Sequence, residues 1–270
     1  MSEPKVVMIT GAASGIGAAV AGLAISKGYR VLLADIAQDR ARAQAEILGP
    51  GAFAVGLDIC DEAQWAAALD LAWSRFGRLD TLINNAAIVH TGWARDVPLK
   101  AHHDTIQTNF FGGLIGMMTA LPRFKAQGSG HLITVSSMNG FLPYPGLASY
   151  AAAKHALRAF HAAVAIEERA SPVDFTLVYP TATETPMLEK EAQDDAMALA
   201  FSGTPIPAAT VAEAIVEAMV TRPAEVFVPE GRGEIVKKLG IDPAALRAYV
   251  EANEAIGWEK LQKRRAAGQG

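Results

Sequence analysis

Three side chains with complementary proton chemistry lie close together in the second half of this chain: Ser137, Tyr150 and Lys154. If Tyr150 opens a helix, Lys154 lies one turn further along the same face, because residues four apart are neighbours on a helix. A phenol titrates near pKa ~10, and a neighbouring ammonium group favours the phenolate and lowers this pKa. The spacing therefore predicts a tyrosine that exchanges a proton with an alcohol or a carbonyl, while the Ser137 hydroxyl holds the same oxygen.

A second informative cluster lies near the amino terminus, where Gly11, Gly15 and Gly17 follow an apolar run at positions 6–10. Glycine allows a tight turn and lets the backbone approach a pyrophosphate without an intervening Cβ. The helix that follows would add free amide groups and the positive end of its dipole. These residues predict a dinucleotide-binding turn, with an ordinary glycine loop as the alternative.

Together, the two clusters resemble the short-chain dehydrogenase/reductase family. The resemblance rests on Ser137 and on two runs, Thr10-Gly11-Ala12-Ala13-Ser14-Gly15-Ile16-Gly17 and Tyr150-Ala151-Ala152-Ala153-Lys154. Either run alone is a weak signal, whereas both in this order are specific. The resemblance extends from about Lys5 to Pro229 and implies a Rossmann fold and a nicotinamide dinucleotide cofactor.

Short apolar runs alternate with longer amphipathic segments, which predicts parallel strands covered by helices on both faces. The predicted strands are Val6–Thr10, Arg30–Ala34, Ala52–Leu57, Thr81–Ile83, Leu132–Val135, Phe175–Val178 and Val226–Val228. The predicted helices are Gly15–Lys27, Gln38–Leu48, Glu62–Phe76, Lys100–Lys125, Ser149–Arg169 and Ala209–Thr221. Right-handed crossovers then give an α/β fold, a doubly wound parallel sheet of about seven strands in three layers.

We expect one domain over residues 1–270, because no repeat and no low-complexity linker interrupts this pattern. The segment at about 181–207 contains three prolines between a strand and a helix, and we predict that it is a substrate-loop insertion. The tail at about 231–270 is predicted to be helical, with Lys263-Arg264-Arg265 as a solvated end.

Composition narrows the classes of function. The formal charge of −4 argues against nucleic acid as a partner, because phosphate binding needs an excess of basic residues. The single cysteine, Cys60, cannot form an internal disulfide. No signal peptide or membrane span is predicted, so we expect a cytoplasmic protein. The six histidines are scattered and form no spaced ligand set, so no metal site is predicted.

Asp35 follows the second predicted strand and is expected to select the cofactor. Its carboxylate can accept hydrogen bonds from both ribose hydroxyls of NAD and would repel the 2′-phosphate of NADP. Ile36 comes next, so no basic residue stands ready for that phosphate, and Ser14 occupies a position that is often basic in NADP-using relatives. We therefore expect NAD, with a turn-forming aspartate as the alternative.

The resemblance implies further contacts with the cofactor. Asp58 and Ile59 would meet the adenine ring, although Asp58 could equally be a helix N-cap. Ala87 and Thr181 replace glycines that the family usually has, and Thr185 would bond to the carboxamide. The other residues implied to contact NAD are Ile16, Asn85, Ala86, Ala87, Tyr150, Lys154, Pro180 and Thr183.

The resemblance also assigns roles at the reacting centre to Asn109, Ser137, Tyr150 and Lys154. Tyr150 would exchange the proton, and Ser137 would position the substrate oxygen. Lys154 would lower the pKa of Tyr150 and hold the nicotinamide ribose. Asn109 would anchor a water molecule that links Lys154 to solvent, or would be an ordinary polar helix residue.

The substrate pocket is expected to be mostly apolar and aromatic. Its candidate residues are Met138, Asn139, Phe141, Tyr144, Leu147, Met187, Leu188 and Trp93. No arginine among them offers a clamp for an anion, which favours a hydrophobic secondary alcohol or ketone as the small-molecule partner. Each of these residues could equally be ordinary core.

Three functions fit this sequence. The first is an NAD-dependent alcohol dehydrogenase, and the second is an NADH-dependent ketoreductase that runs in the other direction. The third, from a different class, is a catalytically silent NAD-sensing protein, against which the intact catalytic set weighs. The resemblance further implies a homodimer or homotetramer that pairs the helices near 100–125 and 149–169.

Overall fold

Seven parallel strands form the central sheet of the computed structural model, which describes residues 3–267. The strands are β1 (Val6–Thr10), β2 (Arg30–Asp35), β3 (Ala52–Gly56), β4 (Thr81–Asn84), β5 (Gly130–Val135), β6 (Val173–Pro180) and β9 (Glu225–Val228). Their order across the sheet is β3-β2-β1-β4-β5-β6-β9. The chain thus runs outward from β1 to β3 and returns to the other side of β1, which confirms the predicted doubly wound sheet. The outermost positions of the predicted domain and tail, 1–2 and 268–270, lie outside the described residues.

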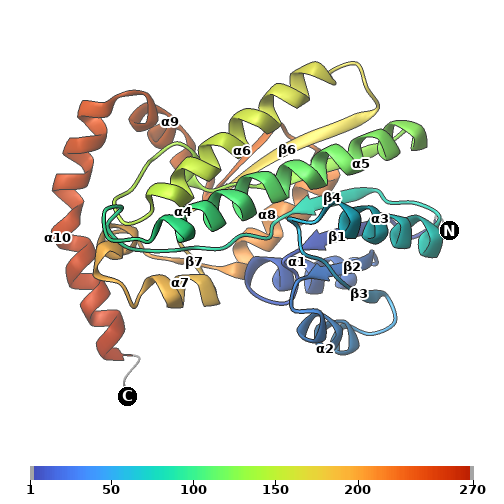
Figure 1. The fold of residues 1–270 in the computed structure, drawn as a ribbon, viewed down its shortest axis with the longest axis horizontal. Helices are drawn as coiled ribbons and strands as arrows, with labels where there is room; N and C mark the ends of the chain where they lie inside the picture. Colours follow the sequence, from blue (N-terminus) through green and yellow to red (C-terminus); the bar gives the residue numbers. More distant parts are fainter. Residues whose placement is uncertain (1–2, 268–270) are drawn as a thin grey trace.

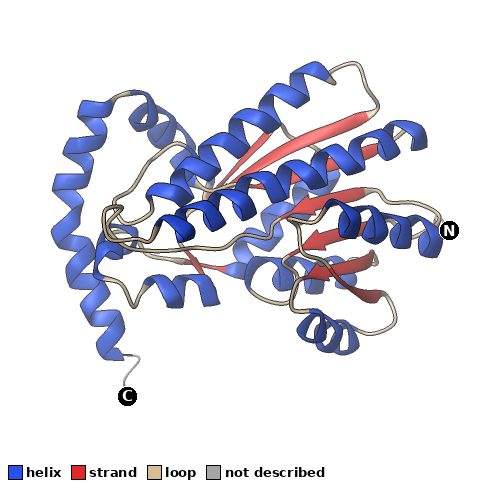
Figure 2. Cartoon of the chain, in the orientation of Figure 1, coloured by secondary structure: helices blue, strands red, loops and turns tan. Residues whose placement is uncertain are grey.

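Helices cover both faces of this sheet (Figures 1 and 2). One face carries α1 (Gly15–Ser26), α2 (Gln38–Leu48) and α8 (Ala208–Thr221), and the other carries α3 (Glu62–Phe76), α5 (Gly113–Gln127) and α6 (Ala148–Glu167). Val7 and Ile9 of β1 pack on the first layer, whereas Val6 and Met8 pack on the second. Because both sides of a strand are buried, the strands are continuous apolar runs rather than alternating patterns.

The predicted helix Lys100–Lys125 is interrupted. It consists of α4 (Leu99–Ile106), a π-helical turn η1 (Gln107–Gly112) and α5. Gly112 packs so closely on Ile59 that a Cβ would lie 2.6 Å from the Ile59 Cδ1. Asn109 lies inside the π-helical turn and is buried, and such turns frequently occur at functional sites.

The segment predicted to be an insertion has regular structure of its own. It contains β7 (Thr183–Glu184), α7 (Pro186–Glu191), a 3-10 helix η3 (Asp195–Phe201) and β8 (Ile206–Pro207), and β7 pairs with β8 in parallel. The carboxyl-terminal helices are α9 (Gly233–Ile241) and α10 (Pro243–Ala267). Helix α10 stands at the left edge of Figure 1 and packs on η3. The packing is close, because a Cβ on Gly257 would lie 2.1 Å from the carbonyl oxygen of Ala198.

The end of α10 is not a solvated tail, so this prediction is wrong. The Arg264 guanidinium bonds to both carboxylate oxygens of Glu184, at 2.9 and 2.6 Å, and also pairs with Glu189. Arg265 bonds to the Asp195 carboxylate at 2.6 Å. These contacts tie the 181–207 insertion to the last helix, far away in the sequence.

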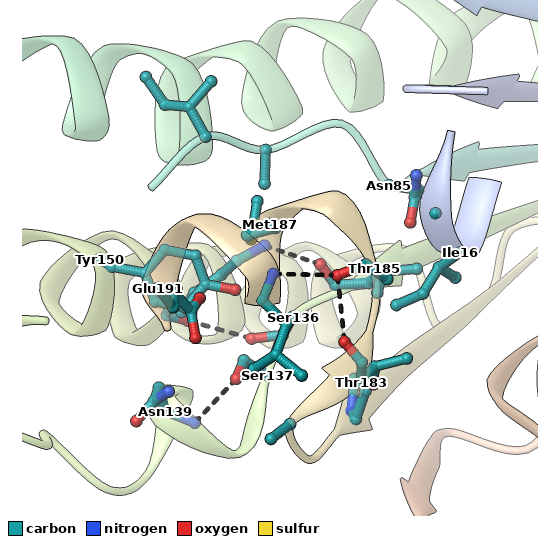
Figure 3. A pocket seen from close by; sticks show the side chains of 18 of the residues that line it. Ile16, Asn85, Ser136, Ser137, Asn139, Tyr150, Thr183, Thr185, Met187 and Glu191 are labelled. Atoms are coloured by element: carbon teal, nitrogen blue, oxygen red, sulfur yellow. Dashed lines mark hydrogen bonds between the residues drawn. The ribbon is translucent and has the colours of Figure 1, made fainter. Parts of the chain in front are cut away.

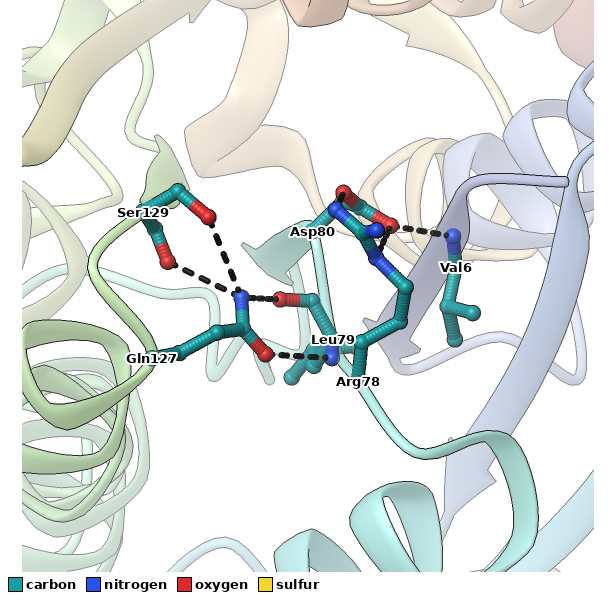
Figure 4. A network of polar contacts seen from close by, with 6 residues as sticks. All are labelled: Val6, Arg78, Leu79, Asp80, Gln127 and Ser129. Atoms are coloured by element: carbon teal, nitrogen blue, oxygen red, sulfur yellow. Dashed lines mark hydrogen bonds and ion pairs between the residues drawn. The ribbon is translucent and has the colours of Figure 1, made fainter. Parts of the chain in front are cut away.

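A polar network holds the amino-terminal ends of two central strands (Figure 4). The Asp80 carboxylate accepts hydrogen bonds from the Val6 amide at 2.8 Å and from Arg78 at 3.1 and 2.6 Å. The Gln127 side chain bonds to both backbone groups of Leu79, at 3.2 and 2.8 Å. The network occupies the amino-terminal ends, and open α/β sheets bind ligands at the opposite, carboxyl ends of their strands.

Two results apply to residues 3–267 as a whole. None of their helices has the length and the apolar composition that crossing a membrane requires. Among the same residues, no three histidine, cysteine, aspartate or glutamate side chains gather into a set that could hold a metal ion.

Candidate active site

A cavity of about 520 Å³ opens at the carboxyl ends of the central strands. The predicted site residues that line it are Gly11, Ser14, Gly15, Ile16, Asp35, Ile36, Asp58, Ile59, Asn85, Ala86, Ala87, Ser137, Met138, Asn139, Tyr144, Leu147, Tyr150, Lys154, Pro180, Thr183, Thr185, Met187 and Leu188. Open α/β sheets bind ligands at this edge, where the strand order reverses. Cofactor, catalytic and substrate predictions thus converge on one cavity.

The glycine turn packs against the end of β4. Gly15 has a φ of +55°, in the region that side chains with a Cβ rarely adopt. A Cβ on Gly17 would lie 2.3 Å from the Gly11 carbonyl oxygen and 2.8 Å from the Asn85 Nδ2. A Cβ on Gly11 would lie 2.9 Å from the Cα of Ala86. Glycine therefore lets this turn pack closely on itself and on the end of β4 at the start of α1, the position where helix N-termini bind phosphate groups.

Thr10 joins this turn to the segment after β4. Its Oγ1 accepts hydrogen bonds from the amides of Asn85 and Ala86, both at 3.0 Å. The Asn85 Nδ2 in turn donates to the Thr10 carbonyl at 2.9 Å. Ala87 follows as a half-buried part of the lining, so its methyl group is accommodated there.

Asp35 ends β2 with its carboxylate held by the backbone. Oδ2 accepts a hydrogen bond from the Ala13 amide and Oδ1 accepts one from the Ala37 amide, both at 2.9 Å. Arg40 of α2 also lines the cavity, together with Asp35 and Ile36. The expectation that no basic residue is available here is therefore wrong, because a helix returns Arg40 toward the end of β2.

Asp58 follows β3, and its Oδ1 accepts a hydrogen bond from the Cys60 amide at 2.9 Å. The N-cap of α3 is instead Asp61, which accepts hydrogen bonds from the amides of Ala63 and Gln64 at 2.8 and 3.1 Å. Asp58 is therefore not the helix cap that the sequence left open as an alternative.

Ser137, which follows β5, lies near Tyr150 of α6 (Figure 3), and Lys154 of the same helix lines the same cavity. Ser137 and Tyr150 both line the cavity, and the Ser137 hydroxyl accepts a hydrogen bond from the Asn139 amide at 3.1 Å. The Lys154 Nζ lies 5.5 Å from the Tyr150 ring centroid and donates to the Val135 carbonyl at 3.0 Å. The predicted helical spacing therefore places a hydroxyl, a phenol and an amine in one corner of the cavity.

The electrostatics of this corner differ from the prediction. Burial raises the pKa of the Tyr150 phenol, the Glu191 carboxylate raises it further, and the hydrogen bond with Ser137 only partly offsets both. Burial also lowers the pKa of Lys154 to about 8. The expected lowering of the Tyr150 pKa by Lys154 is thus not seen, and withdrawal of the phenolate from water is the largest cause of the raised pKa.

Asn109 supports the segment that follows β4. Its Nδ2 donates to the Ile88 carbonyl and its Oδ1 accepts from the Ile88 amide, both at 2.8 Å. Because both polar atoms of this side chain are bonded, it fixes the backbone beside Ala87. A water link from Asn109 to Lys154 stays a prediction.

Thr185 connects the insertion to the glycine turn. Its Oγ1 accepts a hydrogen bond from the Leu188 amide at 3.3 Å, as the N-cap of α7, and donates to the Thr183 carbonyl at 3.1 Å (Figure 3). Its Cγ2 lies 3.2 Å from where a Cβ on Gly15 would be. The start of the insertion thus closes over the predicted cofactor turn.

Two predicted substrate residues lie elsewhere. Phe141 packs on Tyr179 and Phe227, with ring centroids 5.0 and 5.8 Å away, in a separate apolar cluster. Trp93 is 40% exposed and does not line the cavity. Aromatic type alone was therefore a poor guide to the lining.

Three unpredicted residues do line the cavity: Glu191 of α7, Arg232 of the short helix η4 (Glu230–Arg232), and Tyr249 of α10. Arg232 adds to the lining an arginine, a residue type that was absent from the predicted substrate residues. No local spacing connects these residues to Ser137 or Tyr150, because the insertion and the last helices come from remote parts of the chain. No signal in the sequence singles them out, because Glu191 and Arg232 lie among other charged residues.

Comparisons with known proteins identify the family of this chain. The sequence model for the short chain dehydrogenase family matches residues 5–196. The chain is 36% identical over 192 residues to trans-4-hydroxycyclohexanecarboxylate dehydrogenase of Sinomonas cyclohexanicum, covering 68% of this chain and 74% of that protein. It is 31% identical over 190 residues to 3-alpha-(or 20-beta)-hydroxysteroid dehydrogenase of Mycobacterium bovis, covering 70% and 73% of the two chains.

A solved structure of 3-ketoacyl-(acyl-carrier-protein) reductase from Brucella melitensis, complexed with NADH, is also similar. It superimposes with a TM-score of 0.75 at 30% identity, over 84% of this chain and 97% of that one. Fold, catalytic corner and sequence similarity lead to the same conclusion: this chain belongs to the short chain dehydrogenase family, whose members are oxidoreductases.

Proposed function

We propose that this protein uses NAD to interconvert a hydrophobic secondary alcohol and its ketone, with Tyr150 as acid and base. The observation that carries the proposal is a single cavity lined by Asp35, by the glycine turn, and by the Ser137, Tyr150 and Lys154 corner. Gly11 and Gly15 line the cavity at the start of α1, which supports a dinucleotide bound with its pyrophosphate at this turn. When bound, the nicotinamide supplies the acceptor or donor of the hydride.

The residues of the chain would supply position and proton transfer. Ser137 would donate a hydrogen bond to the substrate oxygen, and the Tyr150 phenol would give or take its proton. Lys154, buried beside them, would hold the ribose of the cofactor. Asp35 would accept hydrogen bonds from the adenosine ribose, which favours NAD over NADP.

The substrate class follows from the lining and from the relatives. Met138, Leu147, Leu188 and Leu199 give the cavity apolar walls. The similar proteins are named for a cyclohexane hydroxy acid and for hydroxysteroids. Both observations support a cyclic or otherwise bulky secondary alcohol.

Reduction of a ketone is the second candidate direction, and the Tyr150 pKa favours it near neutral pH. A phenol whose pKa lies above its ordinary value is protonated there, ready to donate to a developing alkoxide. Oxidation needs the deprotonated phenol and would gain rate as pH rises.

A substrate screen with one variant tests the proposal. Cyclic secondary alcohols and ketones are offered with NAD or NADH, and absorbance of NADH is followed. Tyr150→Phe should lower kcat by roughly 100- to 10,000-fold, the usual range for acid–base catalysis, while NADH still binds. Tyr29→Phe, remote from the cavity, is the matched control. Turnover undiminished in Tyr150→Phe would remove the catalytic assignment.

The same measurements distinguish an enzyme from an NAD-sensing protein without catalytic activity. A protein that binds NADH tightly yet turns over none of the alcohols or ketones would fit a sensor rather than an enzyme. The presence of all four proposed catalytic residues favours the enzyme over the sensor. They are Asn109, Ser137, Tyr150 and Lys154.

We also propose a homodimer or homotetramer formed through the layer of η1, α5 and α6. Phe111, Met118 and Ile166 are 42%, 37% and 67% exposed on these elements, and a partner subunit would cover such apolar side chains. Sedimentation would report a monomer if this is incorrect. A cytoplasmic location stays a prediction.

A further inference from the structure

Arg232 is an arginine in the cavity wall without an acidic partner. Within residues 3–267, its guanidinium makes none of the ion pairs found within 4 Å. Its one hydrogen bond in this range is a long contact of 3.5 Å from Nη2 to the Tyr249 hydroxyl. Its Nε is buried with no hydrogen-bond partner. Leaving a buried guanidinium donor without a hydrogen bond costs free energy. Arg232 can therefore bind an acceptor that the described residues do not supply.

Two tyrosine rings and a glycine surround the Arg232 guanidinium in the cavity wall. The rings of Tyr144 and Tyr249 stack with centroids 6.4 Å apart. Arg232 Nη1 lies 3.8 Å from where a Cβ on Gly203 would be, so the guanidinium lies beside a residue without a side chain. Burial alone would raise the pKa of Tyr249, but hydrogen bonds with Tyr144, Arg232 and Ser202 lower it. Hydroxyl and guanidinium donors therefore gather around one spot in the lining.

The charges of Glu191 and Arg232 favour one orientation of a negatively charged substrate in this cavity. Glu191 lies close to the reacting phenol of Tyr150 and repels an anion there. Arg232 attracts an anion at the end lined by Tyr144 and Tyr249. A substrate with a negative group would therefore point that group toward Arg232, which leaves its hydroxyl carbon free to face Tyr150.

Two of the three residues of this group come after the segment that matches the family model, whereas Tyr144 lies within it. The family match covers residues 5–196, whereas Ser202, Arg232 and Tyr249 follow it.

We propose that Arg232, Tyr249 and Tyr144 form a carboxylate-binding subsite, so that the substrate is an apolar hydroxy acid or keto acid. The planar fork of the guanidinium matches the two oxygens of a carboxylate, and the tyrosine hydroxyls add single donors. This inference rests on the proposed function, because it names the substrate class of the same cavity.

Matched substrates test the subsite. The acid 4-hydroxycyclohexanecarboxylate and the uncharged alcohol 4-methylcyclohexanol are compared by kcat/KM with NAD. Wild type should prefer the acid. Arg232→Met should lower that preference by roughly 10- to 150-fold, the effect of losing a charged hydrogen bond, and Arg232→Lys should lose less. Arg247→Met, an exposed arginine of α10, should keep the wild-type preference, and melting curves confirm that each variant is folded.

A binding experiment separates this inference from the proposed function. Cyclohexanecarboxylate is titrated into the protein with NADH present, and heat is measured. Binding to wild type that Arg232→Met loses supports the subsite even if neither alcohol is turned over, a result that would count against the proposed function alone. No preference for the acid in wild type, an unchanged preference in Arg232→Met, or no binding of cyclohexanecarboxylate to wild type would overturn the subsite.

Discussion

Glu191 of α7 lies close enough to Tyr150 of α6 for its carboxylate to raise the pKa of the phenol. Burial in turn raises the pKa of Glu191 to about 7. The two groups come from segments that are separated by a strand and by the start of the insertion. A negative charge beside the Tyr150 phenol opposes formation of the phenolate, so under the proposed function Glu191 would raise the pH at which alcohol oxidation begins.

The first prediction is that Glu191→Gln shifts the pH profile of alcohol oxidation toward acid, by about one pH unit. Without the carboxylate, the phenolate of Tyr150 forms at lower pH. The profile is measured as kcat/KM from pH 6 to 10, with Glu217→Gln, an exposed residue of α8, as the control. An unmoved profile would show that Glu191 does not act on Tyr150.

The same variant should be more stable at alkaline pH. The folded pKa of Glu191, about 7, lies above its ordinary value of 4.5. Its contribution to stability is therefore full below pH 4.5 and is lost as pH rises through about 7. Glu191→Gln should melt about 2–4 °C above wild type at pH 8, with a smaller difference at pH 5.

The second prediction concerns cofactor choice at Asp35 and Arg40. Wild type should prefer NAD, because the Asp35 carboxylate repels a 2′-phosphate. Asp35→Ala removes this repulsion and leaves Arg40 in the lining, so the NADP-to-NAD ratio of kcat/KM should rise on the order of 100-fold. Adding Arg40→Ala should reverse most of that rise. A wild-type preference for NADP would contradict the assignment of Asp35.

The third prediction concerns the contacts from α10 to the insertion. Arg264→Gln combined with Arg265→Gln removes the bonds to Glu184, Glu189 and Asp195. The KM for the alcohol should rise several-fold while the KM for NAD changes less, and proteolysis within 181–207 should quicken. Exposed ion pairs contribute little to global stability, so the melting temperature should change slightly. Lys263→Gln, whose lysine pairs only with exposed Glu259 among the described residues, is the matched control, and equal effects in it would contradict the role of the two arginines.

The fourth prediction is a loss of stability in acid through two buried histidines. Burial lowers the pKa of His131 to about 4 and that of His161 to about 3, from 6.5. Their contribution to stability is full above pH 6.5 and is lost as pH falls through about 4 and about 3. The melting temperature should therefore fall steadily between pH 6.5 and 4.

Substitution of His161 tests whether this histidine causes the loss of stability in acid. His161→Phe should lower the melting temperature at pH 7, because the 3.0 Å contact with Thr134 is lost, yet it should flatten the decline toward pH 4. His103→Gln, at an exposed position, should keep the wild-type slope. An unchanged slope in His161→Phe would show that other groups cause the acid sensitivity.

The residues that could be predicted are those whose role depends on near neighbours in the chain. The alternation of strands and helices was enough to predict the sheet and its covering layers. A strand that is buried on both faces is a continuous apolar run, which can be recognised in the sequence. The turn at Gly15 could be predicted from glycine type and the following helix. The meeting of Tyr150 and Lys154 follows from a spacing of four on α6.

The remainder depended on segments that only folding brings together. Glu191, Arg232 and Tyr249 come from α7, η4 and α10, and no repeat or spacing relates these elements to β5 or α6. The pKa of Tyr150 could not be predicted either, because it depends on burial and on a carboxylate from another element. Backbone geometry is set over one or two turns of chain, whereas the charge and solvation of a cavity are set by every element that packs around it.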